Sequence, residues 1–189
     1  SWYKDDLLKF LPEHKFIIIL RDPRAVTNSY IENRWGLGTN VYSGAHRWKS
    51  EVTIQQQLIL DFPDNFLPIK FEDLISDSQC VVNKVCAFLS IKFESSMLNY
   101  FDQKSFYKEQ KENANTNSKL DKGIVTKWKS KFSIRKINII ETICSDLMDD
   151  FNYEKVGEKI EMSSMERNYY LLHQSIIGEI QMIYQYRKG

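Results

Sequence analysis

An unbroken run of five apolar residues, Phe16 to Leu20, is the strongest feature of the hydrophobic pattern of this chain. A charged residue bounds the run on each side, as is typical of a strand that is fully buried in a parallel sheet. The stretch Phe66 to Phe71 has the pattern of a second buried strand. We therefore expect two buried strands that run parallel to each other.

Most of the remaining chain has apolar residues at every third or fourth position, the spacing of amphipathic helices. Asp22 can cap a helix that has Pro23 at its first position and runs to about Arg34. Ser76, Asp77 or Ser78 can cap another, whose apolar face is Val81, Val82, Val85, Phe88 and Leu89. Further helices are predicted over residues 2–11, 46–60, 134–151 and 158–188, with loops over residues 36–44 and 103–119.

Two strands among six or seven helices form an unbalanced set for an α/β domain. Additional strands upstream would explain the imbalance. The chain opens with Ser1, in a segment that already has helical spacing, so we expect it to begin in the middle of a larger protein. The predicted class is α/β, in the form of a helix-rich partial domain with few parallel strands.

Composition narrows the classes of function. A chain of 189 residues, 42% of them hydrophobic, can bury one substantial core. Its net charge of +1 favours neither nucleic acid nor an anionic membrane as a partner, so any anion site must be built locally. No apolar run reaches the roughly 18 residues that a membrane span needs.

Three cysteines, Cys80, Cys86 and Cys144, show neither a metal-binding spacing nor a disulfide framework. All three fall in apolar helical patterns, so we expect inert cysteines in the core. No metal is expected. Reduced cysteines favour the cytoplasm as the compartment, with the Golgi lumen as the alternative.

The turn after the first predicted strand carries the candidate chemistry. A helix that begins where a parallel strand ends offers amide donors and a partial positive charge to an anion. Arg21 can add a bidentate guanidinium, and Ser29, eight residues later, can add a hydroxyl on the same side. A phosphate would suit this set. The alternative is that Arg21 pairs with a nearby carboxylate and Ser29 binds nothing.

The stretch FIIILRDPRAVTNSY, residues 16–30, resembles the 3′-phosphate-binding segment of sulfotransferases that use 3′-phosphoadenosine 5′-phosphosulfate. In that family, a strand-terminal arginine and a serine eight residues later both contact the 3′-phosphate of the nucleotide. The resemblance implies this role for Arg21 and Ser29.

Two later segments resemble the same family in the same order. LPIKFEDLISD, residues 67–77, is similar to its second strand and the helix that follows, with Phe71 where a tyrosine near the nucleotide is common. DKGIVTKWKSKFS, residues 121–133, is similar to its basic-Lys-Gly element, which implies that Lys122 and Gly123 close over the 3′-phosphate. Asp121 stands where the family often has arginine, so we expect a weaker clamp.

Other residues in these segments have a structural interpretation beside the functional one. Glu72 and Asp73 can form a capping pair at the strand-to-helix turn, and Gly123 can serve a simple turn. Trp128 keeps the spacing of the family, and we expect it to anchor packing. The lysines around it, Lys127, Lys129 and Lys131, are expected to form a solvated face.

The resemblance covers residues 10–153 and implies the P-loop-NTPase-like three-layer sulfotransferase fold. We divide the chain into residues 1–155, the C-terminal part of such a domain, and residues 156–189, a helical extension. The implied reaction moves a sulfuryl group from 3′-phosphoadenosine 5′-phosphosulfate to an acceptor hydroxyl or amine, without a metal. A small molecule or a carbohydrate is the expected acceptor.

The catalytic residues stay unassigned. In the family, the 5′-phosphosulfate loop and the catalytic base precede the segments that match, and nothing in this chain matches that loop. We therefore expect the chain to be inactive alone. A noncatalytic nucleotide-binding or interaction module is the main alternative. A P-loop kinase fragment is a second one, which accounts less well for the pair Arg21 and Ser29.

The last predicted helix carries an apolar stripe outside the resemblance, formed by Met165, Tyr169, Leu172, Ile176, Ile180 and Ile183. This stripe can dock on the domain or form a homodimer with a second copy. Docking is favoured, because the stripe is short and Gly178 interrupts it.

Overall fold

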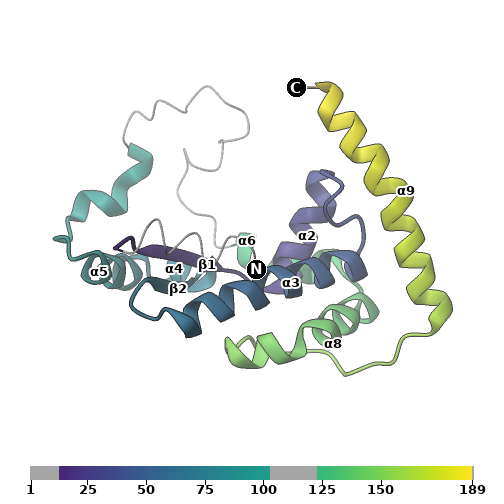
Figure 1. Cartoon of the computed structure of the whole chain (residues 1–189), viewed down its shortest axis with the longest axis horizontal. Helices are drawn as coiled ribbons and strands as arrows, with labels where there is room; N and C mark the ends of the chain where they lie inside the picture. Colours follow the sequence, from purple (N-terminus) through teal and green to yellow (C-terminus); the bar gives the residue numbers. More distant parts are fainter. Residues whose placement is uncertain (1–12, 103–122, 189) are drawn as a thin grey trace. The chain divides into compact units, whose positions relative to one another are not determined.

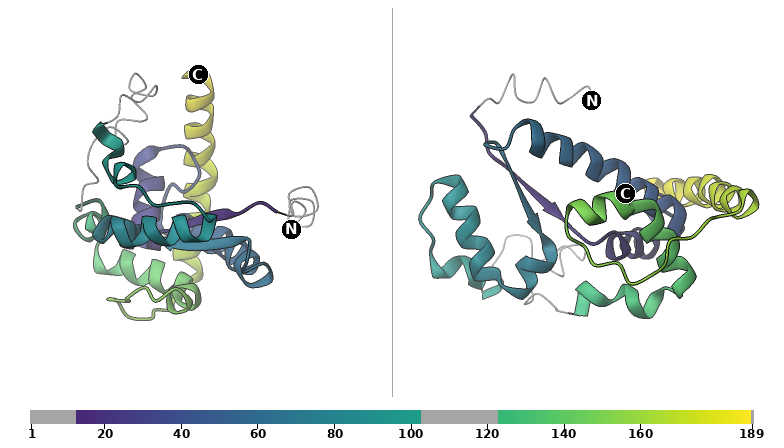
Figure 2. Two further views of the ribbon diagram at one scale, coloured as in Figure 1. Left: turned by 90° about the vertical axis from the view of Figure 1, so that its left-hand side faces the viewer. Right: turned by 90° about the horizontal axis from the view of Figure 1, so that it is seen from below.

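In the described part of the chain, two parallel strands, joined by two helices, form a sheet (Figure 1). The computed structural model describes residues 13–102 and 123–188. β1 (Phe16–Leu20) pairs with β2 (Phe66–Lys70) in a register that places Phe16 beside Phe66. The strands lie side by side in the right-hand view of Figure 2. The two predicted strands and their parallel direction are confirmed.

The sheet is less buried than its sequence predicts. Leu20 and Phe66 are buried, whereas Ile17 and Ile19 are 40% and 56% exposed. Alternate side chains of a strand point to opposite faces, so Ile17 and Ile19 share one face of β1. The expectation of a fully buried first strand was wrong, because none of the described residues covers this face.

The described chain divides into two compact units. Of the described residues, 13–20, 58–102 and 123–124 belong to unit 1, and 21–57 and 125–188 belong to unit 2. Each unit therefore combines two stretches of the sequence. This is a different division from the predicted one at residues 155 and 156, which stays a prediction.

In unit 1, helical segments follow β2: α4 (Phe71–Ser76), α5 (Ser78–Leu89) and the 3-10 segment η1 (Ser95–Asp102). Asp77 caps α5, since its carboxylate accepts a hydrogen bond from Cys80 N at 3.0 Å. Of the three predicted caps, Asp77 is thus the one used. Val81 and Cys86 are the buried residues of α5.

Unit 2 is helical. Its helices are α2 (Pro23–Asn33), α3 (Val41–Asp61), α7 (Trp128–Lys131), α8 (Ile134–Asp150) and α9 (Ser164–Lys188). The last turn of α3 and the start of α6 (Gly123–Thr126) belong to unit 1. On α8, Ile139, Ile140, Cys144 and Met148 are completely buried. The core of unit 2 therefore runs along α8.

α3 begins earlier than predicted, at Val41. Asn40 explains the difference, because its side-chain oxygen accepts a hydrogen bond from Ser43 N at 2.9 Å and its carbonyl accepts one from Gly44 N at 2.9 Å. An asparagine that caps a helix in this way stabilises its first turn. The predicted loop over residues 36–44 therefore ends at Asn40.

α9 begins later than predicted, at Ser164 rather than near Glu158. The main chain before it bonds instead to side chains of α8: Glu158 N donates to Asn138 Oδ1 at 3.3 Å, and Ile160 N donates to Thr142 Oγ1 at 3.1 Å. The side-chain oxygens of Asn138 and Thr142 accept these hydrogen bonds, which main-chain carbonyl oxygens would accept in a helix.

α9 docks on the loop that follows α2, within unit 2. Gln174 donates to Gly36 O at 2.7 Å and accepts from Thr39 N at 2.8 Å, while Gln181 accepts from Gly36 N at 3.1 Å. Only a glycine fits here, because Gly36 has a φ of 75° and its Cβ would lie 2.5 Å from Gly178 O. The favoured docking of the tail is found, but polar side chains make it and the apolar stripe does not.

The cysteines are free, and two of them are buried, Cys86 and Cys144. Burial raises the pKa of the Cys144 thiol. Cys80 is exposed in the first turn of α5, so the core position expected for it was wrong. Across residues 13–102 and 123–188, no helix is long and apolar enough to cross a membrane, and no three His, Cys, Asp or Glu side chains gather as metal ligands. The helix predicted over residues 2–11 and the loop over residues 103–119 lie outside the described residues.

Candidate functional site

The first turn of α2 is fixed by its cap. Asp22 Oδ1 accepts a hydrogen bond from Arg24 N at 2.8 Å, and Pro23 occupies the first helical position, as predicted. Proline at this position has the backbone angle of a helix already set and removes an amide that would have no helical partner. The positive end of the helix dipole thus lies directly after Arg21.

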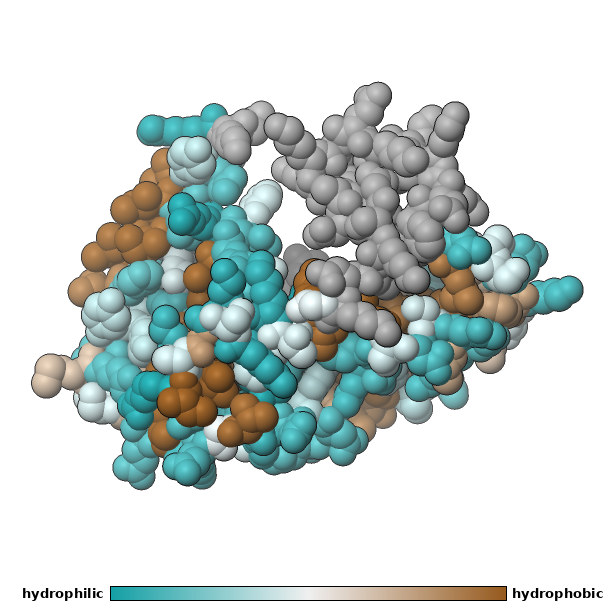
Figure 3. All heavy atoms as spheres, turned by 180° about the vertical axis from the view of Figure 1, so that it is seen from behind, coloured by the Kyte–Doolittle hydropathy of each residue, from teal (hydrophilic) through white to brown (hydrophobic). Residues whose placement is uncertain are grey.

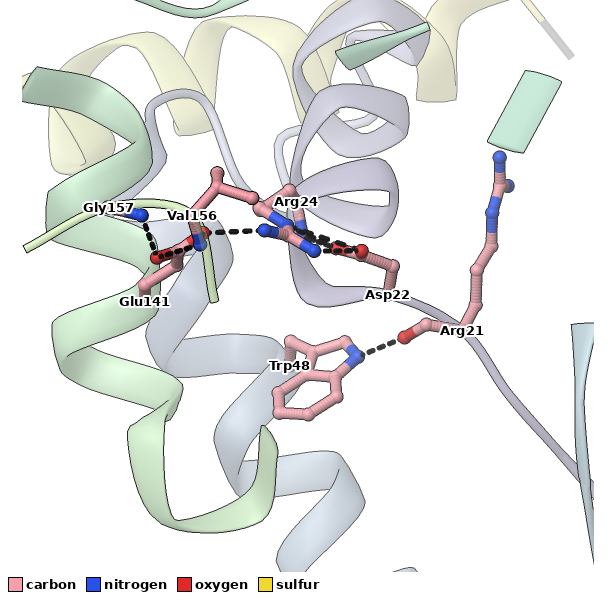
Figure 4. A network of polar contacts seen from close by, with 7 residues as sticks. All are labelled: Arg21, Asp22, Arg24, Trp48, Glu141, Val156 and Gly157. Atoms are coloured by element: carbon pink, nitrogen blue, oxygen red, sulfur yellow. Dashed lines mark hydrogen bonds and ion pairs between the residues drawn. The ribbon is translucent and has the colours of Figure 1, made fainter. Parts of the chain in front are cut away.

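Arg21 is held through its main chain. Its carbonyl oxygen accepts a hydrogen bond of 2.9 Å from the indole nitrogen of Trp48 on α3, and Trp48 is 2% exposed. The side chain of Arg21 extends away from the contacts that surround Arg24 (Figure 4). The packed interior of unit 2 therefore fixes the backbone from which this guanidinium projects.

Behind this turn lies a buried ion network, which we call the Arg24 network and which consists of Asp22, Arg24 and Glu141. Arg24 donates to the two carboxylate oxygens of Asp22 at 2.9 and 2.6 Å and to Glu141 Oε1 at 2.5 Å (Figure 4). The three residues are only 6%, 4% and 3% exposed. Charge-assisted hydrogen bonds of this kind join α2 rigidly to α8.

Glu141 also holds the chain that leaves α8. Its carboxylate accepts hydrogen bonds from Val156 N at 3.2 Å and from Gly157 N at 2.8 Å. One arginine cannot neutralise two carboxylates, and these amide donors stabilise the remaining negative charge. The same carboxylate thereby fixes both the start of α2 and the segment that leads to α9.

The Arg24 network sets the pKa of its arginine. Burial alone would lower the pKa of Arg24, but hydrogen bonding to Asp22 and the charges of Asp22 and Glu141 outweigh burial and raise it. Arg24 therefore stays charged, and both of its carboxylate partners are occupied within the protein.

Trp128 packs the third family-like segment against α2. Its side chain is 3% exposed and clusters with Ala25 and Ile137. The guanidinium carbon of Arg24 lies 4.1 Å from the centre of the indole ring, a cation–π contact. Trp128 thus has the packing role expected for it. Its contact with Arg24 joins two of the family-like segments, residues 16–30 and residues 121–133.

Ser29 lies two turns into α2 and is half-buried. Its hydroxyl oxygen accepts a hydrogen bond from Asn33 Nδ2 at 3.2 Å. Because a serine hydroxyl can accept and donate at once, this bond leaves its hydrogen able to reach a further acceptor.

The remaining predicted site residues are Phe71, Lys122 and Gly123. Phe71 is the first residue of α4 and is half-buried, Gly123 is the first residue of α6 and is exposed, and both belong to unit 1. Lys122 lies outside the described residues. Glu72 and Asp73 occupy the first turn of α4, where acidic side chains suit the helix dipole. That Arg21, Ser29, Lys122 and Gly123 bind the 3′-phosphate, with Phe71 near the nucleotide, stays a prediction.

The lysines near Trp128 are exposed, as expected. Lys127 Nζ lies 2.7 Å from Glu32 Oε2, and Lys131 Nζ lies 3.8 Å from Glu32 Oε1. The hydrogen bond from Lys127 lowers the pKa of Glu32. These exposed pairs join the last turn of α2 to α7 on the surface, whereas the Arg24 network joins α2 to α8 in the interior.

Sequence reasoning missed Arg24 and Glu141. A signal for Glu141 is present, since it lies among Ile137, Ile140 and Cys144 at helical spacing, on the face of α8 that should be apolar. A carboxylate on a buried face requires a cation or several donors. The pattern does not say which of the 26 lysines and arginines of the chain supplies that cation.

Known proteins match both the segments and the fold. A family model described as a sulfotransferase domain matches residues 7–152, which is most of the chain. The chain belongs to the sulfotransferase family. The family membership predicted from the three segments is confirmed.

Among its sulfotransferase relatives, a 3-beta-hydroxysteroid sulfotransferase of Cavia porcellus is 27% identical over 128 residues, which cover 61% of this chain and 43% of that protein. Sulfotransferases 2A1 and 2A2 of Rattus norvegicus are each 26% identical over 174 residues, which cover 75% of this chain and 59% of those proteins. The chain thus spans about half the length of the curated relatives it matches.

A solved sulfotransferase domain from the curacin biosynthetic pathway has a similar fold. It aligns with a TM-score of 0.61 at 19% sequence identity and covers 74% of this chain and 54% of that chain. This confirms the predicted fold class, a helix-rich α/β structure with a small parallel sheet.

Proposed function

We propose that this sulfotransferase-family protein transfers a sulfuryl group from 3′-phosphoadenosine 5′-phosphosulfate to an acceptor hydroxyl or amine, and that this chain supplies the 3′-phosphate side of the donor site. Membership of the family supports the reaction class. The observation that carries the proposal is the start of α2, where Arg21 precedes a helix N-terminus that the Arg24 network fixes.

The geometry distinguishes the two arginines of the RDPR segment. Arg24 is buried and donates to two carboxylates, so it stabilises the helix start rather than a ligand. Arg21 has its backbone anchored by Trp48 and its side chain directed away from these carboxylates (Figure 4). A phosphate beside Arg21 would receive the guanidinium fork and the helix dipole, and the hydroxyl of Ser29 would donate one more hydrogen bond.

In the proposed reaction, the bond between sulfur and the bridging oxygen of the 5′-phosphate breaks while sulfur bonds to the acceptor oxygen or nitrogen. A base takes the proton of the acceptor, and the adenosine 3′,5′-bisphosphate leaves with the electrons of the broken bond. Arg21 and Ser29 would act by holding the nucleotide in register with the acceptor. The scheme requires no metal, and it assigns no base to this chain.

We propose a small molecule or a carbohydrate as the acceptor. The name of the Cavia porcellus relative specifies a 3-beta-hydroxysteroid for that protein. An acceptor panel should therefore contain hydroxysteroids beside sugars, with amines of both kinds to separate oxygen from nitrogen acceptors.

Calorimetric titration of the chain with adenosine 3′,5′-bisphosphate and with adenosine 5′-monophosphate tests the proposal. We expect the bisphosphate to bind more tightly, and R21A to weaken that binding by about 10- to 100-fold, the value of a hydrogen-bonded charge. S29A should weaken it by about 2- to 10-fold, as expected for a neutral donor. K159A, which removes an exposed lysine outside the three family-like segments, is the control and should bind normally. Equal affinity for the two nucleotides, or R21A binding as tightly as the wild type, would contradict the proposal.

A further inference from the structure

None of the described residues covers the apolar stripe of α9 after the helix has docked. We call its six residues the α9 stripe. Their exposed fractions range from 51% to 84%, for Met165, Tyr169, Leu172, Ile176, Ile180 and Ile183. Hydrophobic side chains gather along the edge of α9, at the left of Figure 3. An exposed apolar strip of this length on a protein surface indicates an interaction site.

The docking contacts use the other side of the helix. At about 100° per residue, Gln174 and Gln181 lie roughly 140–160° around α9 from Ile176. They bind the loop at Gly36 and Thr39. A partner that covered the α9 stripe would therefore leave the docking contacts in place.

The α9 stripe also lies outside the residues that the family model matches. The family model ends at residue 152, and α9 begins at Ser164. The family model therefore does not indicate what covers the α9 stripe.

The spacing of the α9 stripe is the same from either end. From Met165 to Ile176 the intervals between stripe residues are four, three and four. If the stripe is extended to Arg187, the intervals after Ile176 are again four, three and four. Met165, Ile176 and Arg187 are therefore 11 residues apart. A repeat of 11 residues is about 3.67 residues per turn, so the stripe stays on one face of a nearly straight helix.

A pattern that is symmetric about its centre is complementary to a copy of itself in the opposite direction. With a two-fold axis at Ile176, an antiparallel α9 places Tyr169 opposite Ile183 and Leu172 opposite Ile180, while Ile176 meets Ile176. We propose that the α9 stripe is a homodimer interface in which α9 of two copies pack antiparallel about Ile176.

Charge favours this direction over a parallel pair. In the antiparallel pair, Arg187 lies at the level of Glu166 of the second copy, whereas a parallel pair would place Arg187 beside Arg187. Glu166 already lies beside the stripe, where it pairs with Arg135 at 2.6 Å. The dipoles of the two helices are also opposed only in the antiparallel pair.

The area fits a weak dimer. Burying the exposed half of the α9 stripe in both copies removes on the order of 1,000 Å² from solvent, which is near the lower limit of specific interfaces. We therefore expect reversible association with a Kd in the micromolar range. This inference does not rest on the proposed reaction, since no stripe residue belongs to the candidate nucleotide site.

Sedimentation of the full chain at increasing concentration tests whether the dimer forms. The wild type should shift from monomer to dimer between about 1 and 200 µM. I176D should remain monomeric, because it places two carboxylates against each other at the two-fold axis. S175D adds the same charge one residue away, at an exposed position outside the stripe, and should associate as the wild type does. A circular dichroism spectrum like that of the wild type would show that I176D is folded.

Disulfide trapping tests the direction. In a C80S background, which removes the exposed native thiol, mild oxidation with oxidised glutathione should join two copies of I176C, with release of reduced glutathione. Y169C should not join itself, since the two positions are about 21 Å apart along the antiparallel helices, but it should join I183C when the two variants are mixed.

Three results would overturn the proposal. A wild type that stays monomeric over the whole range would leave the α9 stripe to a different protein. A dimer that I176D does not weaken would place the interface elsewhere. Efficient joining of Y169C to itself would show a parallel pair.

Discussion

Unit 1 and unit 2 bury their apolar residues in different ways. In unit 2, Ile139, Ile140 and Met148 are completely buried, and the core also holds the Arg24 network. In unit 1, the two-stranded sheet leaves Ile17 and Ile19 about half exposed. Parallel sheets are ordinarily covered on both faces, and two strands alone are marginally stable. Among the described residues, unit 2 therefore has the more complete core.

This difference bears on the candidate site. Arg21 is the residue at which unit 1 passes into unit 2, and its fixed contact comes from Trp48 in unit 2. The cap at Asp22 and the buried partner Glu141 also belong to unit 2. The start of α2 is thus positioned by the better-packed unit, and its geometry should survive changes that loosen the sheet.

The largest loss of unfolding free energy is expected from R24A. It leaves the carboxylates of Asp22 and Glu141 buried together without a cation, which should cost about 3–5 kcal/mol of unfolding free energy. K127A removes an exposed cation that also binds α2, and should cost less than about 1 kcal/mol. Urea denaturation of the two variants provides the measurement. Equal losses would mean that the interior network does not hold α2 more strongly than the surface pair does.

A smaller difference in unfolding free energy is expected between the alanine variants of two isoleucines. I140A opens a cavity in the core of unit 2 and should cost about 2–5 kcal/mol, whereas I19A trims a side chain that is 56% exposed and should cost less than about 1 kcal/mol. Thermal and urea denaturation of both variants would measure these values. A large loss for I19A would show that its face of β1 is covered in solution, and the contrast between the units would then fail.

The smallest effect on stability is expected at Tyr30, which joins α2 to α3 inside unit 2. Its hydroxyl donates to Glu51 Oε2 at 2.7 Å, and burial together with this carboxylate raises the pKa of Tyr30 to about 12. A raised pKa favours the protonated folded state, so this contribution is complete below pH 10 and is lost as the pH rises through about 12.

Y30F should remove this part of the pH dependence. We expect the loss of stability between pH 10 and 12 to become smaller by about 1 kcal/mol or less, because Tyr30 is half-exposed and solvent screens the interaction. Urea denaturation at pH 9, 10, 11 and 12 would measure it. If the wild type and Y30F lose stability in parallel, the contact between Tyr30 and Glu51 contributes nothing that depends on pH.

Local signals in the sequence were sufficient for the elements around the site. The apolar run of β1 and the pair Asp22 and Pro23 act within a few residues, so the sequence pattern predicts them. For α5 the pattern narrowed the cap to Ser76, Asp77 or Ser78, and the structure selects Asp77. The three family-like segments then supplied the family. Arg21 and Ser29 are candidates because of residue type and spacing, which are also local.

Long-range contacts account for what the sequence did not predict. Arg24 and Glu141 are 117 residues apart in sequence, and nothing near either residue specifies the other. The exposure of Ile17 and Ile19 depends on what packs against β1 rather than on β1 itself. The late start of α9 depends on acceptors that α8 presents at Asn138 and Thr142.

Amide hydrogen exchange is the sharpest test of the proposal that the start of α2 binds the 3′-phosphate of the nucleotide. Exchange at α2 would be followed in the free protein, with adenosine 3′,5′-bisphosphate and with adenosine 5′-monophosphate. We predict that the bisphosphate slows exchange in the first turns of α2, that the monophosphate does not, and that R21A abolishes the difference. Protection that omits α2, or that is the same with both nucleotides, would contradict it.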